Sequence, residues 1–305
     1  MPPHAHAANR RDFLHAAGAT IAAASLAPLA AAAPSASSEK KFKKAVKYGM
    51  IKHAGSIMDK FKLLSDLGFD GVEVDGPTSL DKDELLAARD KTGIEIPGVV
   101  EATHWKDTFS DPRAEVRAKA VETLEGALRD AKLLGATSVL LVPAVVSKEV
   151  SYADAYKRSQ EAIRKALPLA AEMQVKIAFE NVWNNFLLSP LETARYVDEF
   201  ESPWVGVHFD VGNVVRYGWP EQWIRTLGKR IVKLDIKEYS RKIADEEGVR
   251  KGFRAELLEG DCDWPAVMKA LGEIGYTGWG AAEVPGGGED RLREISVRMD
   301  RIFAS

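Results

Sequence analysis

Short apolar runs alternate with longer amphipathic segments from Lys44 to the end of the chain. Runs that are apolar almost throughout indicate strands buried on both faces, and apolar residues at every third or fourth position indicate helices. The pattern predicts strands at 46–51, 71–74, 94–100, 138–143, 175–180, 205–210, 230–237 and 278–284. It predicts helices at 56–67, 82–92, 112–134, 152–173, 190–200, 220–227, 264–274 and 290–303.

Eight strand–helix pairs are the number at which a parallel sheet closes on itself. Gly135, Gly228 and Gly275 follow predicted helices, at the position where a residue in the left-handed conformation commonly ends a helix. An open doubly wound sheet is the alternative, but no Gly-x-Gly-x-x-Gly follows the first predicted strand. We therefore predict an α/β fold, a (β/α)₈ TIM barrel that forms a single catalytic domain over residues 40–305.

The first 36 residues have a different composition. Asn9-Arg10-Arg11-Asp12-Phe13-Leu14 is a twin-arginine pattern, and a weakly apolar, alanine-rich run follows it to Ala33. The run is short and poor in Leu and Ile for a membrane span. Residues 1–36 are thus predicted to be a twin-arginine signal peptide, removed or unstructured in a periplasmic protein that has no membrane contact after export.

Composition narrows the classes of partner. The 305 residues carry a net charge of −3 with acids and bases well mixed, so neither nucleic acid nor a membrane surface is expected to bind. Cys262 is the single cysteine, which excludes an internal disulfide framework and a thiolate metal cluster. A homodimer is compatible with the sequence, because helices of such barrels commonly pair.

Acidic side chains stand at the ends of four successive predicted strands, namely Glu180, Asp210, Asp235 and Glu283. In a barrel the carboxyl ends of the strands converge on one bowl, and alternation places each acid above an interior position. Taken singly, each acid could cap a helix or pair with a surface lysine, and Asp210 in particular resembles a cap. As a set they predict a metal site, with Mn²⁺ expected first and Mg²⁺ or Co²⁺ next, because oxygen ligands suit these ions.

Polar residues accompany the acids on the interior faces. Lys237 shares a face with Asp235 and is the expected counter-charge for a negative bowl, unless it is a solvated lysine at a strand end. His208 and Lys233 are the polar exceptions among mostly small interior residues.

Four segments in the second half of the chain stand out, namely Phe179-Glu180-Asn181-Val182-Trp183-Asn184-Asn185-Phe186, Phe209-Asp210-Val211-Gly212-Asn213, Tyr217-Gly218-Trp219-Pro220-Glu221-Gln222-Trp223-Ile224 and Leu227-Gly228-Lys229-Arg230-Ile231. Together they resemble the sugar phosphate isomerase/epimerase family of xylose isomerase-like barrels. The resemblance implies metal ligation by Glu180, Asp210 and Glu283, with the two glutamates exchanging a proton beside a carbonyl. It also implies substrate contacts, which fall on His104, Trp105, Asn181, Asn213 and Lys237.

The chain departs from this family at the seventh strand. Relatives usually have His-x-Lys-Asp there, whereas this chain has Asp235-Ile236-Lys237-Glu238. A carboxylate thus replaces the imidazole ligand. Because aspartate is shorter, either the metal shifts or Asp235 binds it through water.

Three functions remain open. The first is a metal-dependent isomerase or epimerase that moves the proton α to the carbonyl of a ketose or keto-sugar, expected to be unphosphorylated because sugar phosphates are scarce outside the cytoplasm. The second is a lyase or hydratase of 3-keto-glycosides, in which Trp183, Trp219 and Trp223 either stack on a second ring or pack as core. The third is a non-catalytic periplasmic sugar-binding protein.

An endonuclease is disfavoured. The barrels of some DNA-repair enzymes are similar, but their sites are rich in histidine, and this chain has only His104 and His208 near the bowl and no basic face.

Overall fold

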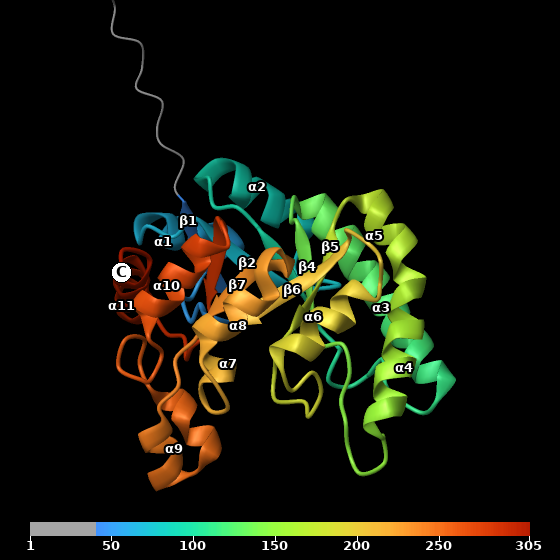
Figure 1. The fold of residues 1–305 in the computed structure, drawn as a ribbon. Coiled ribbons are helices and arrows are strands. Elements are labelled where there is room, and N and C mark those ends of the chain that lie inside the picture. The colour runs from blue at the N-terminus through green and yellow to red at the C-terminus, as the bar shows by residue number, and fades with distance from the viewer. Residues whose placement is uncertain (1–40) are drawn as a thin grey trace, which may run out of the picture. The chain divides into compact units, whose positions relative to one another are not determined.

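The computed structural model describes residues 41–305, so the signal peptide predicted at 1–36 lies outside the described residues. Eight parallel strands close into a barrel in chain order, with β8 beside β1 (Figure 1). This confirms the predicted (β/α)₈ architecture. The strands are β1 (Phe42–Lys47), β2 (Gly71–Gly76), β3 (Gly98–Glu101), β4 (Ser138–Leu141), β5 (Lys176–Glu180), β6 (Val205–Asp210), β7 (Ile231–Ile236) and β8 (Gly278–Ala282).

Helices follow the strands and pack around the barrel (Figure 1). The α-helices are α1 (Ile57–Asp66), α2 (Lys82–Thr92), α3 (Ala114–Leu134), α4 (Tyr152–Ile163), α5 (Leu167–Met173), α6 (Pro190–Asp198), α7 (Gly212–Val215), α8 (Pro220–Leu227), α9 (Arg241–Glu247), α10 (Trp264–Glu273) and α11 (Glu289–Phe303). The 3₁₀ turns are η1 (Tyr48–Met50), η2 (Arg164–Ala166), η3 (Gly228–Arg230) and η4 (Val249–Arg254). Between residues 41 and 305, no helix has the length and apolarity needed to cross a bilayer.

Helix ends follow local chemistry. Ser56 caps α1, because its side chain accepts from the backbone of Asp59 while the Asp59 carboxylate accepts from the Ser56 backbone. Gly135 ends α3 with a φ of 87°, a left-handed conformation that glycine adopts without strain. These are the signals that made most helix boundaries predictable.

Several boundaries differ from the prediction, among them the start of the third strand, which is Gly98–Glu101 and not 94–100. The first strand is Phe42–Lys47 and not 46–51, so Lys47 ends the strand and residues 48–50 form the turn η1. The helix predicted at 152–173 is interrupted by η2, and Pro168 stands in the first turn of α5, where its missing N–H is tolerated.

A helical segment after β7 was absent from the prediction. Helix α9 and turn η4 together span 241–254 and extend from the carboxyl end of the barrel (Figure 1). The hydroxyl of Tyr239 donates to the Val249 carbonyl over 2.8 Å, and the rings of Tyr239 and Phe253 lie 4.9 Å apart. The segment thereby brings an aromatic side chain close to the strand ends.

The apolar core lies between the sheet and the helices, where side chains such as Phe61, Phe179 and Trp264 are buried. The barrel interior is different. His208 and Lys233 are each only 1 % exposed, as their interior positions predict, and buried Glu73 lies with them. Charged groups inside a barrel are stable only when they are paired, which directs attention to their partners.

Candidate active site

The four predicted acids come together at the carboxyl ends of β5 to β8. Oxygen atoms of Glu180, Asp210, Asp235 and Glu283 lie within 4.8 Å of one another, and we call this group the carboxylate bowl. Strand register explains the gathering, because Asp210 is opposite Asp235 and Asp235 is opposite Ala281, two residues before Glu283. Side chains from four strands therefore share one small volume.

The Asp210 carboxylate bonds the first turn of a helix and also faces the bowl. Its Oδ1 accepts from the backbone N–H of Asn213 over 2.9 Å, which fixes the short helix α7. Its Oδ2 lies 3.1 Å from the Lys237 ammonium. Helix α7 sits close to the end of β7, since a Cβ on Gly212 would lie 2.8 Å from the carbonyl oxygen of Lys237. The glycine thus permits the approach that places Asn213.

Two asparagines position the acids. The Asn213 amide donates to Glu180 Oε1 over 3.3 Å and to the Asn181 carbonyl over 3.0 Å. The Asn181 side chain exchanges two hydrogen bonds of 2.8 and 2.9 Å with the backbone of Asp210. Asn181 is predicted to contact substrate, and the structure shows in addition that its side-chain amide holds the backbone of Asp210 at the end of β6.

Lys237 lies among the carboxylates and is not a solvated lysine. Its ammonium is 3.1 Å from Asp210 and 3.3 Å from Glu283, and its side chain is only 17 % exposed. Burial alone would lower the pKa of Lys237, but the charges of Asp210, Glu283 and Glu180 hold that pKa above its ordinary value. The lysine is therefore a permanent cation at the bowl.

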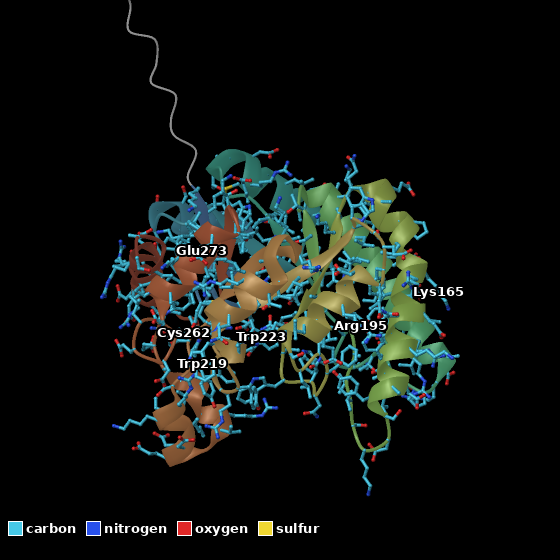
Figure 2. The ribbon with its side chains drawn as sticks, in the orientation of Figure 1. Lys165, Arg195, Trp219, Trp223, Cys262 and Glu273 are labelled. Atoms are coloured by element: carbon cyan, nitrogen blue, oxygen red, sulfur yellow. The ribbon has the colours of Figure 1, made fainter. Side chains whose placement is uncertain are left out.

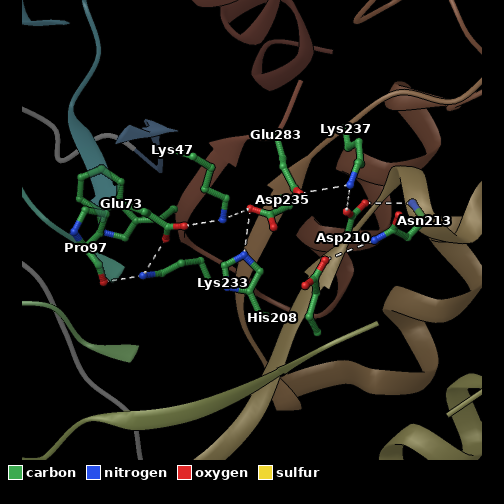
Figure 3. A network of polar contacts seen from close by, with 12 residues as sticks. Lys47, Glu73, Pro97, His208, Asp210, Asn213, Lys233, Asp235, Lys237 and Glu283 are labelled. Atoms are coloured by element: carbon green, nitrogen blue, oxygen red, sulfur yellow. Dashed lines mark hydrogen bonds and ion pairs between the residues drawn. The ribbon is translucent and has the colours of Figure 1, made fainter. Parts of the chain in front are cut away.

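Asp235 is held on one oxygen only. Its Oδ1 lies 2.7 Å from Lys47 Nζ and 3.0 Å from His208 Nε2, while its Oδ2 has no hydrogen-bond partner among residues 41–305 (Figure 3). Burial opposes ionisation, yet His208 and Lys47 keep the pKa of Asp235 well below its usual range. The shorter residue at the imidazole position is thus an oriented, ionised carboxylate with one oxygen available.

Side chains of alternating charge in the barrel interior form a chain of ion pairs that begins at Asp235. Lys47 also pairs with Glu73 over 2.6 Å, Glu73 lies 3.3 Å from Lys233, and Lys233 donates to the Pro97 carbonyl (Figure 3). Burial would raise the pKa of Glu73, but the charges of Lys47 and Lys233 lower that pKa to about 2.

Sequence reasoning missed Lys47 and Glu73. Glu73 was detectable as a single acid within the apolar run Gly71–Val74. Lys47 was not detectable, because the first strand was predicted to end at residue 51 and in the structure ends at Lys47.

Glu180 and Glu283 have the opposite electrostatic environment. Burial and the charges of Asp210 and Asp235 raise the pKa of Glu180 to about 8. The Glu283 side chain is 37 % exposed, but its Oε2 is buried and unpaired among the described side chains, and burial together with Asp235 raises the pKa of Glu283 well above normal. Glu180, with a pKa of about 8, gains and loses a proton near neutral pH, and the raised pKa of Glu283 favours its protonated form, as an acid/base pair requires.

The arrangement fits a divalent cation. Five carboxylates and three ammonium groups leave two negative charges when all are ionised, which a divalent ion would balance. Unpaired buried oxygens on Asp235 and Glu283 offer ligand atoms. Hard cations bind such oxygen sets. The charged groups counted are Glu73, Glu180, Asp210, Asp235, Glu283, Lys47, Lys233 and Lys237.

His104 and Trp105 lie in the loop after β3. His104 is buried, its Nδ1 accepts from the Val142 backbone over 3.4 Å, and burial lowers its pKa to about 4, so the imidazole is neutral. The Trp105 ring is exposed and lies edge-on to His104 at 5.7 Å. The exposed Trp105 ring, which packs on the buried and neutral His104, is suited to contact a ligand.

Fold and site together define a TIM-barrel protein with an acidic, lysine-stabilised centre at the carboxyl ends of its later strands. The sequence matches the family described as xylose isomerase-like TIM barrel over residues 61–300. The chain belongs to this family.

Its relatives are sugar epimerases. The chain is 24 % identical over 260 residues to L-ribulose-5-phosphate 3-epimerase UlaE of Escherichia coli O1:K1 / APEC, covering 81 % of this chain and 89 % of that protein. Among solved structures, a D-tagatose 3-epimerase-like protein superposes with a TM-score of 0.72 at 20 % identity, covering 86 % of this chain and 97 % of that one. The apo form of 3-keto-D-glucoside 4-epimerase YcjR from E. coli also gives 0.72, at 16 % identity and 88 % and 100 % coverage.

Proposed function

We propose that this protein is a divalent-metal-dependent sugar epimerase that moves the proton α to the carbonyl of an unphosphorylated ketose or keto-sugar. The observation that carries the proposal is the pair Glu180 and Glu283, two carboxyl groups with raised pKa values at one bowl. The epimerase names of the relatives support the reaction class.

The two glutamates divide the proton transfer. Asn213 holds Glu180 by Oε1, which leaves Oε2 to take the carbon-bound proton. Lys237 lies 3.3 Å from Glu283 Oε1, which leaves the unpaired Oε2 to return a proton on the opposite face of the carbon. Since β5 and β8 are separated by two strands, the carboxyl groups approach the bowl from different sides.

Four side chains would hold the metal, namely Glu180, Asp210, Asp235 and Glu283. The ion, which we propose to be Mn²⁺, would supply the Lewis acid that polarises the carbonyl. The ammonium of Lys237 stays beside the bowl and stabilises the ionised carboxylates during the transfer.

Solvent exchange tests the proposal directly. Protein loaded with Mn²⁺ is incubated with ketoses and keto-sugars in D₂O, and deuterium at the carbon beside the carbonyl is measured by NMR and mass spectrometry. Glu180→Gln and Glu283→Gln should each reduce exchange by about 10² or more. The exposed Glu172→Gln serves as the matched control. Full activity in either site variant would remove that glutamate from the mechanism.

Product analysis separates the rival functions. A lyase or hydratase of 3-keto-glycosides would start with the same proton abstraction but release an aglycone, whereas epimerisation conserves mass. A non-catalytic sugar-binding protein would be stabilised by sugar without metal and would exchange no deuterium.

We also propose export by the twin-arginine pathway to the periplasm, on the strength of Arg10-Arg11 alone. Replacing both arginines by lysine should retain the protein in the cytoplasmic fraction, and unchanged fractionation would reject the signal.

A further inference from the structure

We propose that the reacting sugar is presented as a glycoside, whose second ring binds in an aromatic pocket beside the carboxylate bowl. The inference rests on the proposed function for the reacting ring and adds a substrate class. The pocket lies between the loops that follow β5 and β6 and has a volume of about 330 Å³. This is the lower end of the range for ligand pockets and is suited to a single ring.

The pocket adjoins the bowl through Asn213, which lines the pocket while its amide donates to Glu180. A row of aromatic rings makes a second connection. The Lys237 ammonium lies 5.1 Å from the Phe253 ring, the rings of Phe253 and Trp183 lie 4.8 Å apart, and those of Trp183 and Tyr217 lie 5.5 Å apart. The row begins at a bowl residue and ends at the pocket.

Trp183 is fixed in this row. Its indole N–H donates to the Asn213 carbonyl over 2.9 Å, and its ring packs on Tyr239 at 5.7 Å. In contrast, the outer wall is open to water, because Tyr217 is 70 % exposed and Leu188 is 67 % exposed. The fixed Trp183 ring and the exposed Tyr217 and Leu188 side chains offer a ligand apolar area for stacking. Because Trp183 is already held in place, little conformational entropy is lost when the ligand binds.

The chemistry of the lining selects a ring over a phosphate. None of the pocket's lining residues, all within 41–305, is a lysine, arginine or histidine. The nearby Arg241 is already engaged, since its guanidinium donates to the carbonyls of Val215 and Gly218. A phosphate would leave its charge unpaired here, whereas an apolar, uncharged lining suits an aglycone or a second sugar ring.

Trp219 provides a matched control. Sequence reasoning grouped it with Trp183 and Trp223, which both border or line the pocket, but Trp219 is not among the lining residues. Its ring lies 5.7 Å from the Arg241 guanidinium, and Trp219 and Trp223 are both labelled in Figure 2. Trp219 is thus an exposed aromatic residue near the pocket and outside it.

The test uses the full chain loaded with Mn²⁺ and two non-reacting probes, methyl and phenyl β-D-glucopyranoside, with binding measured by titration calorimetry. The phenyl glucoside should bind about threefold to tenfold more tightly than the methyl glucoside. Tyr217→Ala should abolish this difference and leave the methyl glucoside unaffected, whereas Trp219→Ala should preserve it. Thermal unfolding of each variant checks that folding is intact.

Three results would overturn the proposal: equal affinity for the two glucosides, a phenyl preference that survives in Tyr217→Ala, or displacement of the phenyl glucoside by inorganic phosphate at equal concentration. Because binding is measured without turnover, the outcome is independent of the epimerase assignment. If the phenyl glucoside binds more tightly but no deuterium is exchanged, only the epimerase function is rejected. If deuterium is exchanged but the two glucosides bind equally, only the second-ring pocket is rejected.

Discussion

Lys237→Met removes the one ammonium that lies between Asp210 and Glu283, at 3.1 and 3.3 Å. The lysine side chain is 17 % exposed, so water replaces little of the lost interaction. Removing one partner of a buried ion pair lowers the free energy of unfolding by about 3–5 kcal/mol when the remaining charge has no other partner. We expect about 3 kcal/mol for the metal-free protein at pH 8, because the freed carboxylates can take up a proton in part.

The loss should depend on pH in a defined direction. Raised pKa values mean that Glu180 and Glu283 bind protons in the folded state at pH values where the unfolded chain, with a pKa of about 4.3, has lost them. The stability contributed by these groups is therefore complete below pH about 4.3 and decreases as pH rises through the folded pKa values. Because the pKa values of Asp210 and Glu283 are raised, these partners of Lys237 carry more protons at pH 5 than at pH 8, and Lys237→Met should be destabilising by only about 1 kcal/mol at pH 5.

Guanidinium denaturation at pH 5 and pH 8, in EDTA and in Mn²⁺, measures these values, with Lys237→Arg as the charge-conserving control. Saturating Mn²⁺ should restore much of the stability at pH 8, since a ligand at a hundredfold excess over its Kd contributes about 2.7 kcal/mol. An equal loss at both pH values, or the same loss in Lys237→Arg, would refute the electrostatic reasoning.

Three further predictions follow from the contacts of the site. His208→Phe should weaken Mn²⁺ binding about tenfold or more by releasing Asp235, while His208→Gln keeps a donor and stays within about threefold; equal effects in an EPR titration would argue against this support. Asn181→Ala should lower the free energy of unfolding by about 1–3 kcal/mol, because the backbone of Asp210 loses two hydrogen bonds, and an unchanged denaturation midpoint would contradict that role. Mn²⁺ binding at pH 7 should release protons, because Glu180 has a pKa of about 8; calorimetry in buffers of different ionisation enthalpy detects this, and a buffer-independent heat would count against it.

The repeating pattern made the barrel predictable. Strand β6 and helices α2 and α8 have the predicted bounds; Asp81 caps α2 at its start, and Gly93 and Gly228 end α2 and α8. Alternation along β6 and β7 also placed His208 and Lys233 inside the barrel. Periodicity carries this information because each strand of a closed parallel sheet is buried on both sides.

Other parts of the site depend on long-range contacts. The lysine-rich start of β1 resembles a solvated segment, yet Lys44 reaches Asp300 and Lys47 reaches Asp235. Segment 241–254 has no strong apolar period, and only tertiary packing brings Phe253 over Lys237. The orientation of Asp235 depends on donors from β1 and β6, which no local pattern in β7 specifies.

Anomalous diffraction from a crystal grown with Mn²⁺ tests the central claim most directly. We expect one strong peak per chain, about 2.0–2.6 Å from oxygen atoms of Glu180, Asp210, Asp235 and Glu283. A bowl without a peak, or a peak bound elsewhere on the chain, would contradict the account.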